Sequence, residues 1–441
     1  MNVFVGDISA KNENFRGKGL LITFAMGLIL MLAIRDIGGL SLNKYFFFIY
    51  TTVFMCVAKR ETLIYMLCFM YPLLWGLPGT YILLVAVILY FMKTRTFQKN
   101  AVILSLFFVI LEILAMMCYP KLDITEVLQY ICTIVLFFTL LFDNKEMDYR
   151  RAIELYYYGS AVLCLILMIN TLATAPSNWL DLFAKGWFRF GDVQEKENID
   201  MILRVNANTL AYHSVVGMAC GLVLFQIQPQ KTLRIFTVAI MIIHFIAGAL
   251  STSRSWMIVT AVMVLLMMFY STKSWKTVLA TALCLIVVVW GIAWYLEQNP
   301  SILEGFVTRL TDGTMQTGGG RSDVLNEYWN AFSGNSRYWI MGTGVTQYKE
   351  VLGETGSVHN AFQQIVVSYG IPGASIFLIG MICPGLKLAR KELLYWIPFI
   401  VLLLFVQTIQ FINPYTLMFP YIISVFVLKY GASEGKQVSD I

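Results

Sequence analysis

Short motifs place charged or reactive side chains at the ends of long apolar segments of this 441-residue chain. Arg254 lies within "STSRSWM" at 251–257, and His359, one of only three histidines, begins "HNAFQQIVVSYGIPG". Arginine binds phosphate oxygens in a bidentate manner, and histidine exchanges protons near neutral pH. These residue types predict a site that holds a phosphate-bearing ligand and moves a proton. The alternative roles are a lipid-pairing arginine at the membrane surface and a histidine that caps a helix.

Two further arginines stand at comparable positions. Arg204 precedes the asparagine-rich segment "NANTLA", and Arg321 follows three glycines that let the backbone approach a ligand closely. A short helix that begins near Ser322 favours an anion at its N-terminus. We expect these two arginines and Arg254 to bind a diphosphate together, although loop arginines are often simply solvated.

The composition indicates a membrane protein. Hydrophobic residues make up 58% of the chain and charged residues only 13%, which is too little charge to cover the surface of a soluble domain of this length. All eight cysteines fall inside apolar segments, which argues against a disulfide framework and against a cysteine-rich metal site. The expected fold class is an all-α polytopic membrane protein with about 12–14 transmembrane helices of roughly 20 residues each.

Charge placement predicts the orientation of these helices. With both termini in the cytoplasm, twenty of the 32 lysines and arginines fall in inner segments. The first apolar segment, 20–34, is then a retained signal anchor. Segment 62–92 is either two spans or a re-entrant hairpin. Two long loops, 173–206 and 296–358, lie outside.

Four regions follow from this topology. They are an N-terminal transmembrane array (1–172), a central transmembrane region with an outer interfacial helix (173–295), a large helical extracytoplasmic loop (296–358) and C-terminal transmembrane helices (359–441). The interfacial helix is predicted over 177–190, because aromatic and aliphatic residues recur there on one helical face. They are Trp179, Leu182, Phe183, Trp187 and Phe190.

Three polar residues inside apolar segments call for partners. His213 and His244 are predicted to be buried, hydrogen-bonded helix residues, and Glu112 is expected to have a partner or an aqueous cavity. The sequence has no Asp-x-Asp motif, no zinc-ligand spacing, no Gly-x-Ser-x-Gly elbow and no basic and aromatic stripe for nucleic acid. These absences favour a site that uses no metal and no cofactor.

Four motifs together resemble the O-antigen ligase and polymerase family of bacterial membrane glycosyltransferases. They are "RVNANTLA", "STSRS", "GGGRSDVLNEYW" with "YWIMGTGVTQY", and "HNAFQQIVVSYGIPG", in this order over roughly residues 200–375. The resemblance implies a GT-C-like helical bundle in the bacterial cytoplasmic membrane, with an active site that faces outside. It also implies donor and acceptor glycans linked to undecaprenyl diphosphate, and allows for a chain-length regulator protein as a partner.

The resemblance further implies roles for single residues. Arg204, Arg254 and Arg321 would bind the diphosphate, with Arg254 and His359 acting in catalysis. Asn360 and Asn208 would position the acceptor. A polymerase of O-antigen or capsule repeat units is favoured over a ligase that acts on lipid A-core, because the aromatic outer helix and the long loop suit two lipid-carried substrates. A flippase for the same lipid-linked saccharide is the alternative from another class, but its two halves should repeat and its polar residues should lie at mid-membrane.

Overall fold

The computed structural model describes most of the chain. The described residues are 2–94, 98–117, 123–145, 147–184, 188–191, 203, 205–271, 290, 294, 297, 321–348, 360–386, 388, 392–408, 412 and 418–439. They are overwhelmingly helical and contain no β-strand. His359 and Arg204 lie outside the described residues, so their predicted roles stay predictions.

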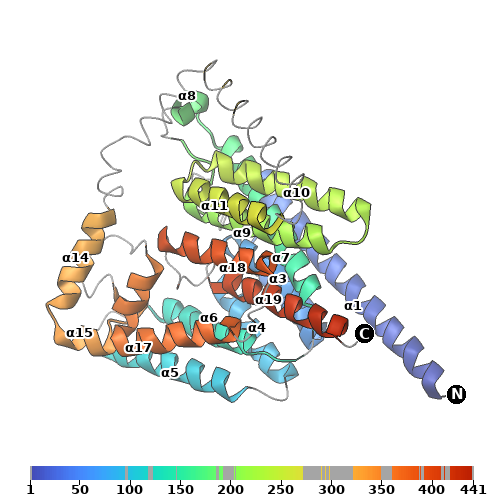
Figure 1. The fold of residues 1–441 in the computed structure, drawn as a ribbon, viewed down its shortest axis with the longest axis horizontal. Helices are drawn as coiled ribbons and strands as arrows, with labels where there is room; N and C mark the ends of the chain where they lie inside the picture. Colours follow the sequence, from blue (N-terminus) through green and yellow to red (C-terminus); the bar gives the residue numbers. More distant parts are fainter. Residues whose placement is uncertain are drawn as a thin grey trace.

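The elements follow one another as helices along the chain (Figure 1). In order they are α1 (Asn2–Leu32), the π-helix η1 (Ala33–Ile37), α2 (Lys44–Val57), α3 (Arg60–Met70), the 3₁₀-helix η2 (Tyr71–Gly76), α4 (Gly79–Lys93), α5 (Lys99–Met117), α6 (Ile124–Leu141), α7 (Tyr149–Ala173), α8 (Trp179–Ala184), α9 (Ala207–Ile227), α10 (Lys231–Leu250), α11 (Arg254–Ser271), α14 (Arg321–Ser333), α15 (Ser336–Met341), α17 (Ala361–Leu386), α18 (Leu393–Phe405), the 3₁₀-helix η4 (Val406–Thr408) and α19 (Met418–Ser439).

Seven helical segments of the described chain are long and apolar enough to cross a membrane. They are Gly17–Ile37, Lys99–Met117, Ile124–Leu141, Tyr149–Ala173, Ala207–Ile227, Lys231–Leu250 and Ala361–Leu386. Five shorter apolar helices of 10–17 residues accompany them. The predicted all-α polytopic fold is confirmed, and the protein is a multi-pass membrane protein.

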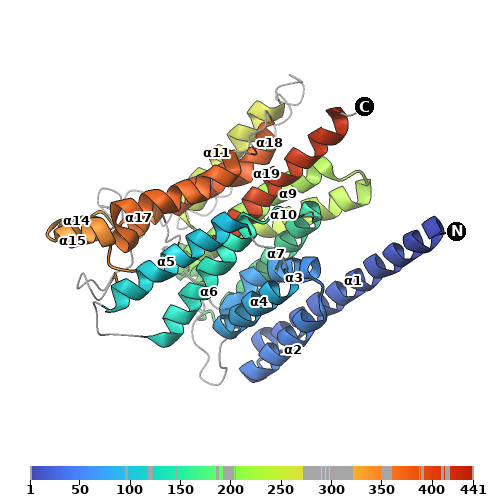
Figure 2. The same ribbon diagram turned by 90° about the horizontal axis from the view of Figure 1, so that it is seen from below.

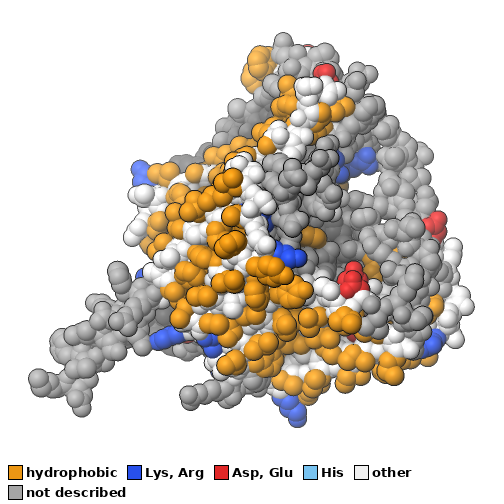
Figure 3. All heavy atoms as spheres, turned by 180° about the vertical axis from the view of Figure 1, so that it is seen from behind, with side chains coloured by type: hydrophobic (Ala, Val, Ile, Leu, Met, Phe, Trp, Pro, Cys, Tyr) orange, Lys and Arg blue, Asp and Glu red, His pale blue; other side chains and the backbone are white. Residues whose placement is uncertain are grey.

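The long helices run side by side with a common tilt, and α1 and α2 form one edge of the bundle (Figure 2). Helix α9 is central, because it packs against α7, α10, α11 and α18. Helices α14 and α15 lie at the other edge, beside the first half of α17 (Figures 1 and 2). Hydrophobic side chains cover most of the described part of one broad face, as expected for a surface against lipid (Figure 3).

Segment 62–92 holds three helical elements, α3, η2 and α4, with Leu77 and Pro78 between η2 and α4. Helix α3 and the 3₁₀-helix η2 continue directly into one another and together rise about 28 Å, which approaches the thickness of the hydrocarbon layer. Almost every side chain of this stretch is buried. Its length therefore suits a span inside the protein better than a short re-entrant loop.

The large loop is hydrogen-bonded to α17 at an interruption of this helix. Gly370 has φ 66°, a left-handed conformation that suits glycine, so the helix ladder is interrupted there. The carbonyls of Val367 and Ser368 instead accept hydrogen bonds from the N–H groups of Thr343 (2.9 Å) and Gly344 (3.0 Å). The end of the large loop is thus fixed to the wall of a membrane helix.

Candidate active site

Arg254 begins α11 immediately after a tight turn from α10. The Ser251 hydroxyl donates to the carbonyl of Gly248 (2.6 Å) and accepts from the N–H of Ser253 (3.3 Å), so it satisfies backbone groups within the turn. Thr252 has φ 50°, an uncommon conformation for a residue with a branched side chain. The Ser251 hydroxyl therefore shapes the turn that presents the half-buried Arg254.

Arg189 ties this turn to the start of α9. Its Nε donates to the carbonyl of Ser251 (3.2 Å), and its Nη2 donates to Oδ1 of Asn208 (3.2 Å). The hydroxyl of Ser253 donates to the same Asn208 oxygen (3.3 Å). The structure thus brings Asn208 and the 251–254 turn together through Arg189, which the sequence motifs did not single out.

The segment that carries Arg189 is not the predicted helix over 177–190. Helix α8 covers only Trp179–Ala184, and residues 188–191 are not helical. The N–H of Phe188 donates back to the carbonyl of Leu182 (3.1 Å), and the Phe190 ring is buried against Trp179 and Phe183. The aromatic side chains therefore pack on one another in a folded-back loop, and the prediction of one continuous interfacial helix was wrong.

Two hydrogen bonds from backbone N–H groups attach this loop to the ends of α10 and α7. The N–H of Phe190 donates to the carbonyl of Leu250 (3.4 Å), and the N–H of Gly191 donates to the hydroxyl of Thr171 on α7 (3.1 Å). Arg189 is therefore held between the ends of α7, α9 and α10. In the sequence, Arg189 stands between two phenylalanines. This pattern is typical of an ordinary cation at a membrane interface and does not indicate a functional residue.

Asn206 explains why Asn208 points into this group. Asn206 is the N-cap of α9, and its Oδ1 accepts hydrogen bonds from the N–H (2.8 Å) and the hydroxyl (3.0 Å) of Thr209. The cap starts the helix at Ala207 and places Asn208 in its first turn. The flanking residues of Arg204, Leu203 and Val205, are both buried, which anchors the chain on either side of that arginine.

A buried network of hydrogen bonds holds α11 just after Arg254, at Trp256. The Trp256 indole donates to the hydroxyl of Ser214 (3.0 Å), which itself donates to the carbonyl of His244. The His244 Nε2 lies 2.9 Å from the hydroxyl of Ser160. These contacts join α7, α9, α10 and α11, so they fix the direction in which α11 leaves the turn.

His213 and His244 are both fully buried, as predicted. His213 pairs through Nδ1 with the hydroxyl of Tyr156 (3.2 Å), and His244 stacks on the ring of Tyr157. These contacts make both histidines parts of the helix packing.

Arg321 and Asn360 each stand at the beginning of a helix, Arg321 in the large loop and Asn360 directly before α17. Arg321 is the first residue of α14, where the predicted short helix is found. Helix α14 packs on α15 and α17 through a small cluster of Tyr328, Phe332, Tyr348 and Val367. The loop is thus held as a compact platform beside α17.

Asn360 caps α17. Its Oδ1 accepts from the N–H of Gln363 (3.1 Å), and its backbone carbonyl accepts from the N–H of Gln364 (3.0 Å). Its amide also lies 3.5 Å from the carbonyl of Gln407, a long contact. The cap fixes where α17 begins.

Glu112 has the partner that its burial requires. Its carboxylate accepts hydrogen bonds from the N–H groups of Val345 (2.8 Å) and Thr346 (2.9 Å) and from the Thr346 hydroxyl (2.6 Å). These donors come from the large loop, so Glu112 fastens the platform to α5. Among the described residues, no group of three His, Cys, Asp or Glu side chains could hold a metal ion.

The group formed by Arg189, Asn208 and the 251–254 turn has the chemistry of an anion site. Arg189 and Arg254 bring two cations to the end of α11, and the helix N-terminus adds its own partial positive charge. A family model described as O-antigen ligase matches residues 236–378. Over these residues the chain is similar to the O-antigen ligase family.

The O-antigen ligase match confirms the resemblance seen in the sequence motifs. It supports a membrane glycosyltransferase of the ligase or polymerase type, a family that implies lipid-linked glycan substrates. The matched segment includes Arg254, Arg321, His359 and Asn360, whereas Arg189 and Asn208 precede it. No curated protein and no solved structure gives a significant match to the chain.

Proposed function

We propose that this O-antigen ligase family member polymerises oligosaccharide repeat units carried on undecaprenyl diphosphate at the outer leaflet. The observation that carries the proposal is the contact of Arg189 with both Ser251 and Asn208. This contact holds the turn that presents Arg254 at the N-terminus of α11. An arginine at a helix N-terminus suits a diphosphate.

The chemistry requires stabilisation of a leaving group. When the anomeric carbon of the donor sugar is attacked, the bond to the diphosphate oxygen breaks and negative charge develops on that oxygen. Arg254, with Arg204 and Arg321, would bind this charge, and Arg189 would hold the turn in place. Arginines can thereby supply what a divalent cation supplies in other glycosyltransferases, so we propose that the reaction is independent of metal.

The acceptor is a sugar hydroxyl that must lose a proton. His359 directly precedes the Asn360 cap of α17, and it would accept this proton as a general base. Asn360 and Asn208 would position the acceptor sugar. A single direct displacement would invert the configuration of the anomeric carbon.

The acceptor distinguishes polymerase from ligase. The test gives the purified protein a synthetic undecaprenyl diphosphate repeat unit, alone or together with lipid A-core, and separates the products by glycan length. A ladder from the repeat unit alone supports the polymerase. Transfer to lipid A-core without a ladder would show that the protein is a ligase rather than a polymerase. No transfer to either acceptor would favour the flippase.

A further inference from the structure

A second polar cluster lies at the far end of α7 from the arginine group. Thr171, near the C-terminal end of α7, contacts Gly191 beside Arg189, whereas Asp143 and Lys145 precede the N-terminus of the same helix. A helix of 25 residues is about 37 Å long. This cluster therefore belongs to the opposite end of the bundle, which the charge placement assigns to the cytoplasm.

Asp143 is fully engaged in this cluster. Its Oδ2 accepts hydrogen bonds from Arg60 and from the Tyr90 hydroxyl (2.6 Å), and its Oδ1 accepts from the N–H of Lys145 (3.0 Å). The ammonium of Lys429 donates to the carbonyl of Asp143 (2.7 Å). The Arg60 guanidinium thus pairs with a carboxylate whose two oxygens are both already bonded, and the Lys429 ammonium binds the backbone carbonyl of the same residue.

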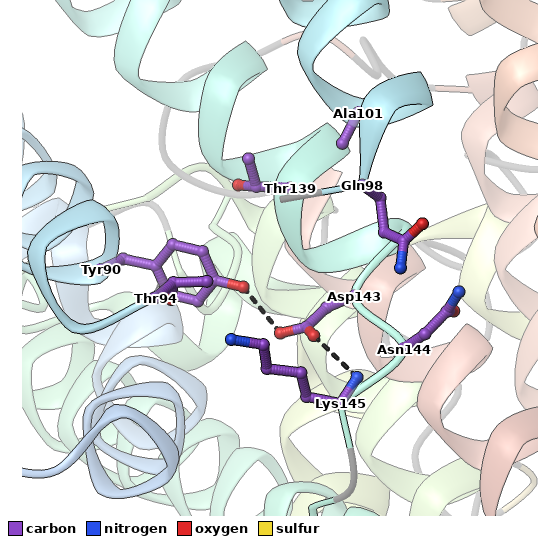
Figure 4. A pocket seen from close by; sticks show the side chains of 8 residues that line it. All are labelled: Tyr90, Thr94, Gln98, Ala101, Thr139, Asp143, Asn144 and Lys145. Atoms are coloured by element: carbon purple, nitrogen blue, oxygen red, sulfur yellow. Dashed lines mark hydrogen bonds between the residues drawn. The ribbon is translucent and has the colours of Figure 1, made fainter. Parts of the chain in front are cut away.

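A cavity of about 140 Å³ opens beside Asp143 (Figure 4). This volume is several times the roughly 30 Å³ that one water occupies in the liquid. It is lined by Tyr90, Thr94, Gln98, Ala101, Thr139, Asp143, Asn144 and Lys145. Gln98 and Asn144 lie on one side of the Asp143 carboxylate, and Lys145 lies on the other (Figure 4).

The uncommitted groups of this cavity are mainly hydrogen-bond donors. Thr94 is only 4% exposed, and its hydroxyl has no hydrogen-bond partner among the described residues. The ammonium of Lys145 and the amides of Gln98 and Asn144 can each donate to a ligand. Ala101 lies in the first turn of the 19-residue helix α5, whose N-terminus adds backbone donors and a partial positive charge.

We propose that this cavity binds a phosphate group, either as inorganic phosphate or as the headgroup of an anionic phospholipid. A tetrahedral oxyanion has acceptor oxygens for donors of this kind, which the cavity offers on Lys145, Gln98, Asn144 and Thr94. A cation is disfavoured, because the carboxylate that could bind it is already taken by Arg60 and Tyr90. This site is independent of the proposed transfer reaction, which takes place at the other end of the bundle.

The test measures thermal unfolding of the full-length protein in two arms. In detergent, inorganic phosphate is titrated against sodium chloride at matched ionic strength, because screening alone also shifts stability. In nanodiscs, lipid mixtures with and without phosphatidylglycerol are compared. A saturable rise of the unfolding temperature with phosphate identifies the free anion as a ligand, and a rise with phosphatidylglycerol alone identifies the lipid headgroup.

Matched variants locate the effect. Lys145→Gln should weaken the apparent affinity by roughly tenfold, the value of one charge-assisted hydrogen bond. Lys231→Gln removes an exposed lysine at the same end of the bundle and should leave the affinity unchanged. Thr94→Val keeps the side-chain volume and should weaken binding by a smaller factor, which guards against a fold defect in the first variant. The proposal is overturned if neither ligand gives a saturable shift, or if Lys145→Gln and Thr94→Val both respond like the unmodified protein.

Discussion

The carboxylate of Glu112 on α5 accepts both the N–H and the hydroxyl of Thr346, which lies 234 residues later in the large loop. A third hydrogen bond comes from the N–H of Val345 to the other carboxylate oxygen. Only a carboxylate accepts on both oxygens, so this position needs Glu rather than its amide. The contact joins the first half of the chain to the platform that carries Arg321.

Replacing Glu112 with Gln should therefore destabilise the protein despite the nearly equal size. The side-chain NH₂ of the glutamine would face a backbone N–H donor that the carboxylate oxygen accepted from before. Leaving such a buried donor unsatisfied costs about 1–3 kcal/mol. We expect a lower unfolding temperature in detergent and a matching loss of glycan transfer. Thr346→Val, which removes only the hydroxyl contact, should give a smaller decrease. An unfolding temperature of Glu112→Gln equal to that of the unmodified protein would show that the carboxylate does not hold the loop.

Arg189 should be needed for transfer although it lies outside the matched family segment. Lysine in its place keeps the charge but cannot donate from two directions to Ser251 and Asn208. We expect Arg189→Lys to lower the transfer rate roughly tenfold, which corresponds to one lost hydrogen bond of about 1.4 kcal/mol. Initial rates with a lipid-linked repeat unit measure this effect. Lys44→Ala, at an exposed lysine of α2, is the control and should transfer normally, and an unaltered rate in Arg189→Lys would remove Arg189 from the site.

Gly248 should tolerate no side chain. A methyl group there would overlap the Trp256 indole and the Ser214 hydroxyl, so Gly248→Ala must displace the network beneath Arg254. Overpacking of this kind costs typically about 1–3 kcal/mol, and we expect both a lower unfolding temperature and slower transfer. Gly19→Ala is the matched control, because nothing lies within 4 Å of the added methyl group. If Gly248→Ala unfolds and transfers glycan like Gly19→Ala, the network does not position α11.

The parts of this structure that depend on local sequence could be predicted, and those that depend on distant contacts could not. The helix that begins within "STSRS", the helix that begins at the asparagine-rich segment and the burial of His213 follow from residue types and spacing. Arg189 was missed because the aromatic period continues to Phe190 while the helix ends at Ala184. The chain reverses there because the aromatic rings pack on one another, and a helical pattern does not contain that information.

The same limit applies to the partner of Glu112. Burial of an acid inside an apolar segment indicated that a partner exists, but its identity required a contact with the large loop. Arg321 was predicted to bind the diphosphate, and Asn360 was predicted to position the acceptor sugar. The structure adds that they begin α14 and cap α17, respectively, and their proposed contacts with substrate stay predictions.

The most direct measurement is glycan transfer by the purified protein from a synthetic undecaprenyl diphosphate repeat unit in the presence of EDTA. We predict that the unmodified protein forms a ladder of glycan lengths. Arg254→Ala should lower the rate by about 10²–10³, as expected when a leaving-group stabiliser is lost, and His359→Ala should abolish the ladder. Two results would contradict a metal-independent transfer by these residues. One is a ladder from the unmodified protein that forms without EDTA and disappears when EDTA is added. The other is full turnover by Arg254→Ala and His359→Ala.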